Sequence, residues 1–240
     1  MTESVGDPAS GLPIGPEVPA HAARRPERRV MQGRFVRLEP LDPESQGASL
    51  WRETHGPAKA PLWRYLFEGP FPDERAFRAH LTRKAASEDP LFFAIVEQRS
   101  RQALGYATLM RIDPAHRCIE VGNILYGPGL QRAPGGTEAQ FLLMRYVFDD
   151  LGYRRYEWKC NALNAPSRRA AVRLGFTFEG IFRQHMIVKG RNRDTAWYSI
   201  LDGEWPKVKE AFERWLAPEN FDTTGTQKQG LETIRNTPKG

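Results

Sequence analysis

Apolar and polar positions in the middle of the chain follow two periods, one typical of strands and one typical of helices. A repeat of two residues indicates a strand, and a repeat of about 3.6 residues indicates a helix. The strongest helical pattern lies in residues 137–151, where Phe141, Met144, Phe148 and Leu151 recur at helical spacing. Runs rich in β-branched and aromatic residues, separated by turn residues, predict strands. The predicted strands are residues 34–39, 91–97, 104–112, 117–126, 156–160, 176–188 and 195–201.

Start and stop residues delimit the predicted helices. Pro43 and Pro166 suit the first turn of a helix, and Gly175 suits the position after a last turn. The helices are expected from residue 43 onward and over residues 72–86, 137–151, 164–175 and 205–216. Three successive strands between residues 91 and 126 favour an antiparallel meander. The pattern therefore predicts an α/β (α+β) fold, with a mixed, mostly antiparallel sheet of about six or seven strands and helices on both faces.

The two ends of the chain differ in composition from the middle. Residues 1–30 contain five prolines, three glycines and few large apolar residues. Such a segment buries too little surface to offset its chain entropy. We therefore expect a disordered N-terminal tail at residues 1–30, one globular domain at residues 31–220 and a flexible C-terminal tail at residues 221–240.

Cysteine usage and hydropathy indicate a cytoplasmic location. Cys118 and Cys160 are far apart, which favours neither a disulfide framework nor a zinc site, so no metal is expected. No apolar run approaches the roughly 20 residues that span a bilayer. The N-terminus lacks a basic segment followed by an apolar core, so we expect no signal peptide and no membrane association.

The positive net charge is concentrated in one stretch. The chain has a formal charge of +6, and residues 150–195 hold ten Lys and Arg against four Asp and Glu. This stretch therefore accounts for the whole excess. A local basic field attracts phosphates, either on a cofactor or on a nucleic acid, although it can also be a solvated face.

Residues 131–137 form a glycine-containing turn between a predicted strand and the predicted helix at 137–151. The first amides of a helix have no intrahelical partner, and the helix dipole is positive there, so this turn suits a phosphate. Arg132 could add a charged contact. The turn can also be a simple helix entry. It matches neither the GxxxxGK[ST] loop of nucleotide triphosphatases nor a GxGxxG dinucleotide motif.

The order of several short motifs carries more information than any one of them. They are Glu120-Val121-Gly122, Gln131, Gly136, Thr137-Glu138-Ala139, Asn164, Ser167, Ala170, Gly175-Phe176, Glu179-Gly180 and Arg183. In this order the chain resembles the GNAT N-acetyltransferase superfamily, and within it the branch of ribosomal-protein N-terminal acetyltransferases. The resemblance extends over residues 33–202.

The resemblance implies a GNAT-type sheet and the transfer of an acetyl group from acetyl-CoA to a primary amine. The acceptor amine can be a protein N-terminus or a small molecule. The residues implied in binding acetyl-CoA are Ile124, Leu125, Tyr126, Gln131, Arg132, Ala133, Gly135, Gly136, Thr137, Asn164 and Ser167. Among these residues, Asn164 can also act as the N-cap of its helix. One departure is Pro134, which replaces the family's usual first glycine and has no N–H to offer a phosphate.

Catalytic roles follow from the same resemblance. Ser167 stands where the branch places a hydroxyl near the departing sulfur, and it can instead be an ordinary first-turn serine. Some members of the family use a tyrosine as the acid and a glutamate as the base. The tyrosine has no match in this chain, and Met186 stands at the position of the glutamate. We choose Glu120 as the general base.

The alternatives to Glu120 as the base are His185 and Asp194, and Glu120 can also be a paired structural carboxylate. Tyr126, Trp197 and Tyr198 could line the acceptor pocket, or belong to the core.

Two other functions stay open. The basic stretch at residues 150–195 could bind nucleic acid, although the sequence has no RNP1, zinc-finger or helix-turn-helix signature. The fold could also be a catalytically inactive sensor of acyl-CoA. The expected partners are acetyl-CoA and an amine acceptor rather than nucleic acid or membrane, and the chain is expected to be a monomer or a homodimer.

Overall fold

The central sheet confirms the mixed, mostly antiparallel architecture. The computed structural model describes residues 4–237. Its eight-stranded sheet has the order β3-β4-β5-β6-β7-β8-β10-β9, and only β7 and β8 pair in parallel. The strands are β3 (Met31–Gln32), β4 (Val36–Pro40), β5 (Leu91–Glu97), β6 (Ala103–Asp113), β7 (Cys118–Tyr126), β8 (Arg155–Asn161), β9 (Thr177–Val188) and β10 (Arg191–Leu201). The strand β3 was not expected, because two residues are too few to show a period.

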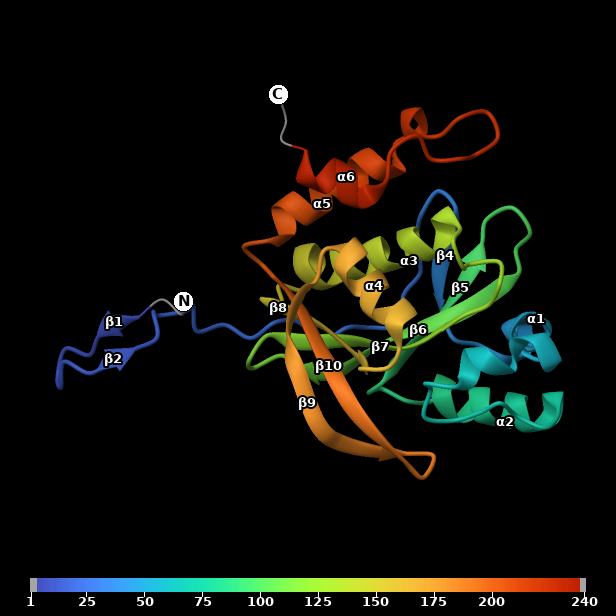
Figure 1. Cartoon of the computed structure of the whole chain (residues 1–240), viewed down its shortest axis with the longest axis horizontal. Coiled ribbons are helices and arrows are strands. Elements are labelled where there is room, and N and C mark those ends of the chain that lie inside the picture. The colour runs from blue at the N-terminus through green and yellow to red at the C-terminus, as the bar shows by residue number, and fades with distance from the viewer. Residues whose placement is uncertain (1–3, 238–240) are drawn as a thin grey trace.

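Helices cover both faces of the sheet, as Figure 1 shows. One side carries α1 (Pro43–Thr54), the 3-10 helix η1 (Pro57–Trp63) and α2 (Glu74–Ala85). The other carries α3 (Pro134–Arg145), α4 (Ala165–Leu174) and α5 (Trp205–Leu216). Side-chain caps begin three of the helices where the sequence predicts a start. Asp42 caps α1, Asp73 caps α2 and Asn164 caps α4. Each side chain accepts a hydrogen bond from a backbone N–H two or three residues further along the chain.

Two separate cores hold these layers together. The larger lies between the sheet and the helices α3 and α5, where the rings of Phe141 and Phe212 stack with 5.3 Å between their centroids. The smaller lies under α1 and α2 and contains Trp63, Phe77 and Tyr106. Side chains alternate between the faces of a strand, so each strand residue belongs to one side or the other.

The helix expected at residues 137–151 begins earlier and changes form at its end. Pro134 is its first residue, which suits a ring with a fixed φ and no N–H. Its last turn is the π-helix η2 (Tyr146–Asp150), and the N–H of Leu151 donates to the carbonyl of Tyr146 at 3.1 Å. Asp149 in that turn accepts from Trp205 Nε1, which ties η2 to α5.

The hairpin of β9 and β10 is tighter than the sequence suggests. Residues 189–194 are predicted as a polar turn, but β10 already begins at Arg191. Only Lys189 and Gly190 form the turn, and both have positive φ values, 51° and 71°. A two-residue loop of this kind matches the twist of paired strands. The polar residues 191–194 are thus part of the sheet.

Both chain ends contain short regular elements within the described residues. Part of the N-terminal segment forms an exposed hairpin, β1 (Val5–Gly6) with β2 (Pro13–Ile14), that projects from the domain in Figure 1. Residues 23–27 lie along the domain, where Ala23 N donates to Pro114 O and Glu27 N to the Tyr146 hydroxyl, each at 2.9 Å. Residues 1–3 and 238–240 of these tails lie outside the described residues.

The C-terminal segment packs on α4 and α5. It contains the short helix α6 (Leu231–Asn236), and its apolar residues Phe221, Leu231 and Ile234 are buried. Arg235 donates to the carbonyl oxygens of Arg173 and Val172 at the end of α4. Three apolar residues are sufficient to dock this segment because α5 offers them an apolar face.

One buried carboxylate fastens α3 to the edge of the sheet. Glu138 is 3% exposed and accepts three backbone N–H groups, from Arg34 at 2.7 Å, Phe35 at 2.6 Å and Val36 at 2.8 Å. These donors lie in the β3–β4 turn, which is distant in sequence. The contact therefore fixes the start of α3 relative to the first strands.

We predict that Glu138→Ala lowers the free energy of unfolding by about 3 kcal/mol, because it removes the acceptor of one buried and two part-buried N–H groups. Urea denaturation of the purified variant measures this value. The matched control is Glu213→Ala on the exposed side of α5, which should stay within about 0.5 kcal/mol of the parent. Equal stability of the two variants would contradict the assigned role of Glu138.

Candidate functional site

The parallel strands β7 and β8 separate part of the way along their length. They pair from Cys118 opposite Arg155 to Val121 opposite Trp158, and no further. Beyond that point β7 has a register shift against β6, and Asn123 takes a positive φ of 47°. An irregularity of this kind bends a strand away from its neighbour. The two strand ends therefore diverge and open the sheet.

A cleft of about 1580 Å³ occupies this opening. Both strands contribute to its walls, together with η1 and its following loop, the start of α3, the helix α4 and the C-terminal segment. Of the residues predicted to bind acetyl-CoA, the cleft brings together Ile124, Tyr126, Gln131, Arg132, Ala133, Gly136, Thr137, Asn164 and Ser167. Leu125 is buried in the smaller core instead, and Gly135 packs toward Val36.

The turn at residues 131–137 is held in a compact form by its own contacts. The Tyr126 hydroxyl donates to Gly136 O at 2.9 Å, and Gln131 Nε2 donates to Tyr126 O at 2.9 Å. A Cβ at Gly136 would lie 2.5 Å from Leu130 O, which only glycine avoids. Arg132 has a positive φ of 58°. The helix α3 starts at the cleft wall, so the positive end of its dipole faces the cleft.

The α4 side of the cleft is cationic. Arg168, Arg169 and Arg173 line it, and Arg132 faces them from the turn. Arg173 donates to Thr137 Oγ1 at 2.9 Å, and no carboxylate of residues 4–237 lies within ion-pair distance of it. Burial lowers the pKa of its guanidinium more than the nearby carboxylate of Glu232 raises it, so this desolvated cation is only partly compensated. An incoming phosphate would supply the missing charge.

Arg173 was missed as a candidate from the sequence, although a signal was present. Asn164, Ser167, Ala170 and Arg173 recur every three residues, and residues three apart on a helix share a face. The basic stretch at residues 150–195 is therefore not one solvated surface. Five of its members line the cleft, namely Lys159, Arg168, Arg169, Arg173 and Arg193.

Asn164 and Ser167 meet at the start of α4. Asn164 Oδ1 accepts from Ser167 N at 3.2 Å, so Asn164 is a helix cap that also faces the cleft. The Ser167 hydroxyl accepts from Trp158 Nε1 at 3.0 Å. Burial raises the pKa of the neighbouring thiol of Cys160, which keeps that thiol protonated at neutral pH.

Glu120 lies on the cleft wall within a network of charges. It is 3% exposed, and its Oε2 is 2.6 Å from Arg111 and 2.9 Å from Lys159 Nζ. Lys159 Nζ is also 2.7 Å from Glu157, which Arg155 contacts at 2.6 Å. Burial alone would raise the pKa of Glu157, but hydrogen bonds from Lys159 and Arg155 outweigh it and hold that pKa below its ordinary value.

The other candidate bases occupy different positions. His185 lines the cleft from β9, and its Nδ1 is 2.9 Å from Thr195 Oγ1. Asp194 accepts from Gln184 N at 2.7 Å and holds the β9–β10 pairing. Its backbone hydrogen bond lowers its pKa, and it is not part of the cleft wall.

Of the three aromatic candidates for the acceptor pocket, two line the cleft and one does not. Tyr126 and Tyr198 line the cleft, whereas Trp197 lies beneath Lys159, whose Nζ is 3.8 Å from its ring centroid.

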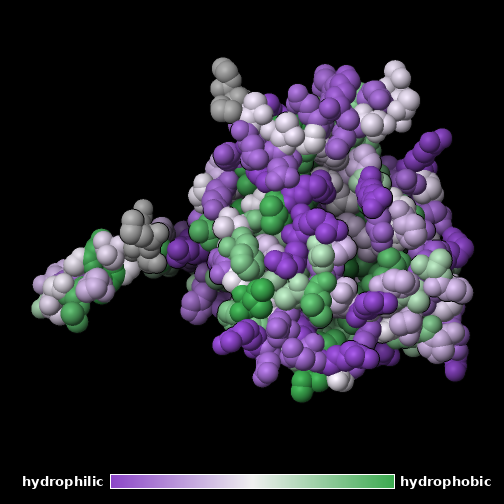
Figure 2. Space-filling view, in the orientation of Figure 1, coloured by the Kyte–Doolittle hydropathy of each residue, from purple (hydrophilic) through white to green (hydrophobic). Residues whose placement is uncertain are grey.

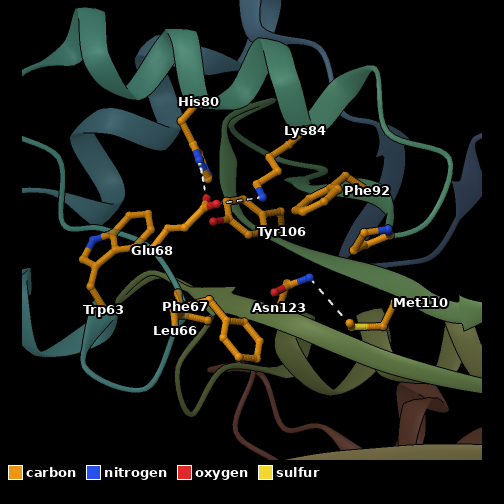
Figure 3. Close-up of a pocket in the computed structure, with 11 residues that line it drawn as sticks. Trp63, Leu66, Phe67, Glu68, His80, Lys84, Phe92, Tyr106, Met110 and Asn123 are labelled. Atoms are coloured by element: carbon orange, nitrogen blue, oxygen red, sulfur yellow. Dashed lines mark hydrogen bonds and ion pairs between the residues drawn. The ribbon is translucent and has the colours of Figure 1, made fainter. Parts of the chain in front are cut away.

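A smaller pocket of about 250 Å³ adjoins the cleft on the α2 side. Figure 3 shows the carboxylate of Glu68 pointing between His80 and Lys84, at 2.7 Å and 3.1 Å respectively. Burial lowers the pKa of His80 to about 4, so that its ring is neutral at pH 7. The two cavities share the side chains of Leu66, Phe67, Met110 and Asn123.

Within residues 4–237, no group of three or more His, Cys, Asp or Glu side chains is placed to hold a metal ion. None of the described helices is both long enough and apolar enough to span a membrane. On the face seen in Figure 2, apolar side chains show among polar ones over the β9–β10 hairpin, where Phe178, Ile181 and Phe182 are exposed.

Comparison with known proteins agrees with the fold. Residues 36–177 match the family described as the acetyltransferase (GNAT) domain. A crystal structure of a GCN5-related N-acetyltransferase from Brucella melitensis is 52% identical with a TM-score of 0.88, covering 90% of this chain and 98% of that one. The N-acetyltransferase YnaD of Bacillus subtilis is 26% identical over 145 residues, which are 60% of this chain and 82% of YnaD.

A further relative, YdaF of Bacillus subtilis, is named "putative ribosomal N-acetyltransferase". It is 30% identical over 109 residues, which are 44% of this chain and 57% of YdaF. The resemblance to the ribosomal-protein branch that the motifs indicate is thereby confirmed.

Proposed function

We propose that this chain, which belongs to the GNAT family of acetyltransferases, moves the acetyl group of acetyl-CoA directly to a primary amine. The observation that supports this most strongly is the opening between β7 and β8, with a helix start and cations at one side. Side chains at 121, 158, 160, 196 and 198 pack in the larger core under α3. Those at 120 and 159 therefore face the opposite side, so the cleft passes through the sheet.

The donor's phosphates fit the side of the cleft formed by α3 and α4. There the first turn of α3 offers its dipole, and Arg132 and Arg173 offer their guanidinium groups. Gly136 lets the turn keep this compact form, because a Cβ there would lie 2.5 Å from Leu130 O. Because Pro134 has no N–H, side-chain cations would supply part of what backbone amides usually provide.

The backbone of β7 supplies donors for the thioester carbonyl. Gly127 N donates to Leu104 O at 3.0 Å, so residues 104 and 127 form a hydrogen-bonded pair. Such pairs alternate along an antiparallel ladder, which makes Tyr106 and Leu125 the next one. The N–H of Tyr126 then points away from β6 and toward the cleft, and we assign the carbonyl contact to it rather than to Leu125.

In the transfer, the amine nitrogen attacks the thioester carbon, so that a C–N bond forms and the C–S bond breaks. Glu120 takes the proton that the nitrogen loses, directly or through a water, using Oε1, because Oε2 already contacts Arg111 and Lys159. Ser167 gives a proton to the departing thiolate and regains one from solvent, to which Glu120 releases its own. The products are the N-acetyl amine and free coenzyme A, with no net change in protons.

An acceptor screen tests the proposed function. Purified protein is incubated with acetyl-CoA and a panel of amines, free thiol is followed optically, and products are identified by mass spectrometry. Calorimetry with acetyl-CoA alone accompanies the screen. Binding without thiol release from any amine would favour an inactive acyl-CoA sensor, and absence of binding would overturn the proposed function.

We predict that Gly136→Val raises the KM for acetyl-CoA at least about tenfold, because the new side chain displaces the turn that faces the phosphates. Steady-state kinetics at a saturating amine concentration measures the change. Gly203→Val is the matched control, because nothing lies within 4 Å of a Cβ at that position and its distance from the cleft leaves KM unaffected. An unchanged KM in Gly136→Val would place the phosphates elsewhere.

We predict that Glu120→Gln lowers kcat by about a hundredfold while the KM for acetyl-CoA changes little, because the amide cannot accept the amine proton. The same assay on His185→Gln separates the two candidate bases. A thermal melt of each variant excludes unfolding, since Gln at 120 also weakens the contacts with Arg111 and Lys159. If Glu120→Gln turns over at the parental rate and His185→Gln does not, His185 is the base.

A further inference from the structure

We propose that the amine acceptor carries a carboxylate close to its amino group, and that Arg193 binds this carboxylate inside the cleft. The inference rests on the proposed function, because it assigns the class of acceptor that the same site uses. It concerns the side of the sheet that faces away from the donor's phosphates.

Arg193 is a buried cation that forms no ion pair within residues 4–237. It lies on β10, is 7% exposed and contributes to the cleft wall. Its side chain makes one hydrogen bond to residues 4–237, from Nε to Thr195 Oγ1 at 3.3 Å, and no described carboxylate lies within 4.0 Å of it. The ring of Phe67 covers it, with 5.1 Å between Cζ and the ring centroid. Its two terminal nitrogens therefore have donors to offer a ligand.

The position of Arg193 separates it from the phosphate side. On β10, Ala196 and Tyr198 point into the core under α3, so odd-numbered residues point the other way. Phe67, which Arg193 contacts, belongs to the segment between η1 and α2 on that other face. Glu120 faces the same way and is close enough to interact with Arg193 electrostatically. Arg193 thus lies beside the proposed base and opposite the α3 start.

The charges around this position favour an anion. Arg111, Lys159 and Arg193 gather near Glu120, while Glu157 is already shared between Lys159 and Arg155. Burial lowers the pKa of the Arg193 guanidinium, a sign that desolvation is not fully offset by neighbours. A guanidinium presents two parallel N–H groups that match a carboxylate, and a buried pair of this kind is stronger than an exposed one.

Matched acceptor pairs test the inference on the unaltered protein. One pair is an α-amino acid and its primary amide, and the other is a peptide whose second residue is Asp or Asn. We expect kcat/KM to be at least about tenfold higher for the carboxylate member of one pair, as a charged hydrogen bond predicts. Preference in the first pair identifies a free amino acid, and preference in the second an acidic protein N-terminus.

Three variants link the preference to the residue. Arg193→Gln should reduce the carboxylate preference to about twofold or less, and Arg193→Lys should keep part of it, because charge remains while the fork is lost. Arg191→Gln is the matched control, since Arg191 is exposed on the same strand and carries the same charge. It should retain the parental preference.

The outcomes distinguish the two proposals. Equal use of both members of each pair by the parent protein overturns the role of Arg193 and leaves the acetyltransferase function standing. A preference that survives in a folded Arg193→Gln variant also overturns it. If no amine releases thiol from acetyl-CoA, the proposed acetyl transfer is overturned, and the role of Arg193 in acceptor binding falls with it. If Arg193→Gln does not fold, the carboxylate preference of the parent protein and its partial loss in Arg193→Lys still test the role of Arg193.

Discussion

The separation of β7 from β8 is the constraint on which the rest of this molecule depends. Two neighbouring parallel strands normally satisfy each other's backbone groups, and here they stop doing so after Val121 and Trp158. The end of β8 keeps its partner on the other side, because Asn161 still pairs with Thr195 of β10. The end of β7 keeps β6, through the register shift at Asn123. Each strand thus retains one neighbour, and the unpaired edges form two facing rows of donors and acceptors that a substrate can use.

A network of ion pairs lies where the sheet opens and fixes the charged side chains there. Glu120 and Glu157 are adjacent in the parallel register, and two buried carboxylates side by side would repel. Lys159 contacts both of them, while Arg111 and Arg155 each contact one. Removing Lys159 would take away the cation that the two neighbouring carboxylates share, which is costly. The network therefore fixes the positions of these side chains at the point where the sheet opens.

Much of the architecture could be predicted from periodicity, and the exceptions have physical causes. The strand expected at residues 91–97 is β5 as observed, because its ends coincide with turn residues. The strand expected at 195–201 begins at Arg191, since four polar residues concealed it. That error also concealed Arg193, whose burial follows from its place in the sheet and from Phe67, which is distant in sequence. Motif order located the α3 turn and α4, but pairing between distant residues, such as Glu120 with Lys159, has no local signal.

The C-terminal segment restrains α4, and α4 carries the arginine that lies opposite the proline-containing turn of α3. With Pro134 at the first helical position, one amide donor is missing from the proposed phosphate site. Arg173 adds a cation on the opposite wall, but an arginine without a carboxylate needs a fixed backbone to hold it against Thr137. Arg235 donates to the carbonyl of Arg173 at 2.7 Å and so restrains the end of α4. Trp215, Gln227 and Glu232 complete the same wall of the cleft. The segment that composition marks as a tail thereby lines the cleft and supports the arginine to which we assign compensation for the proline.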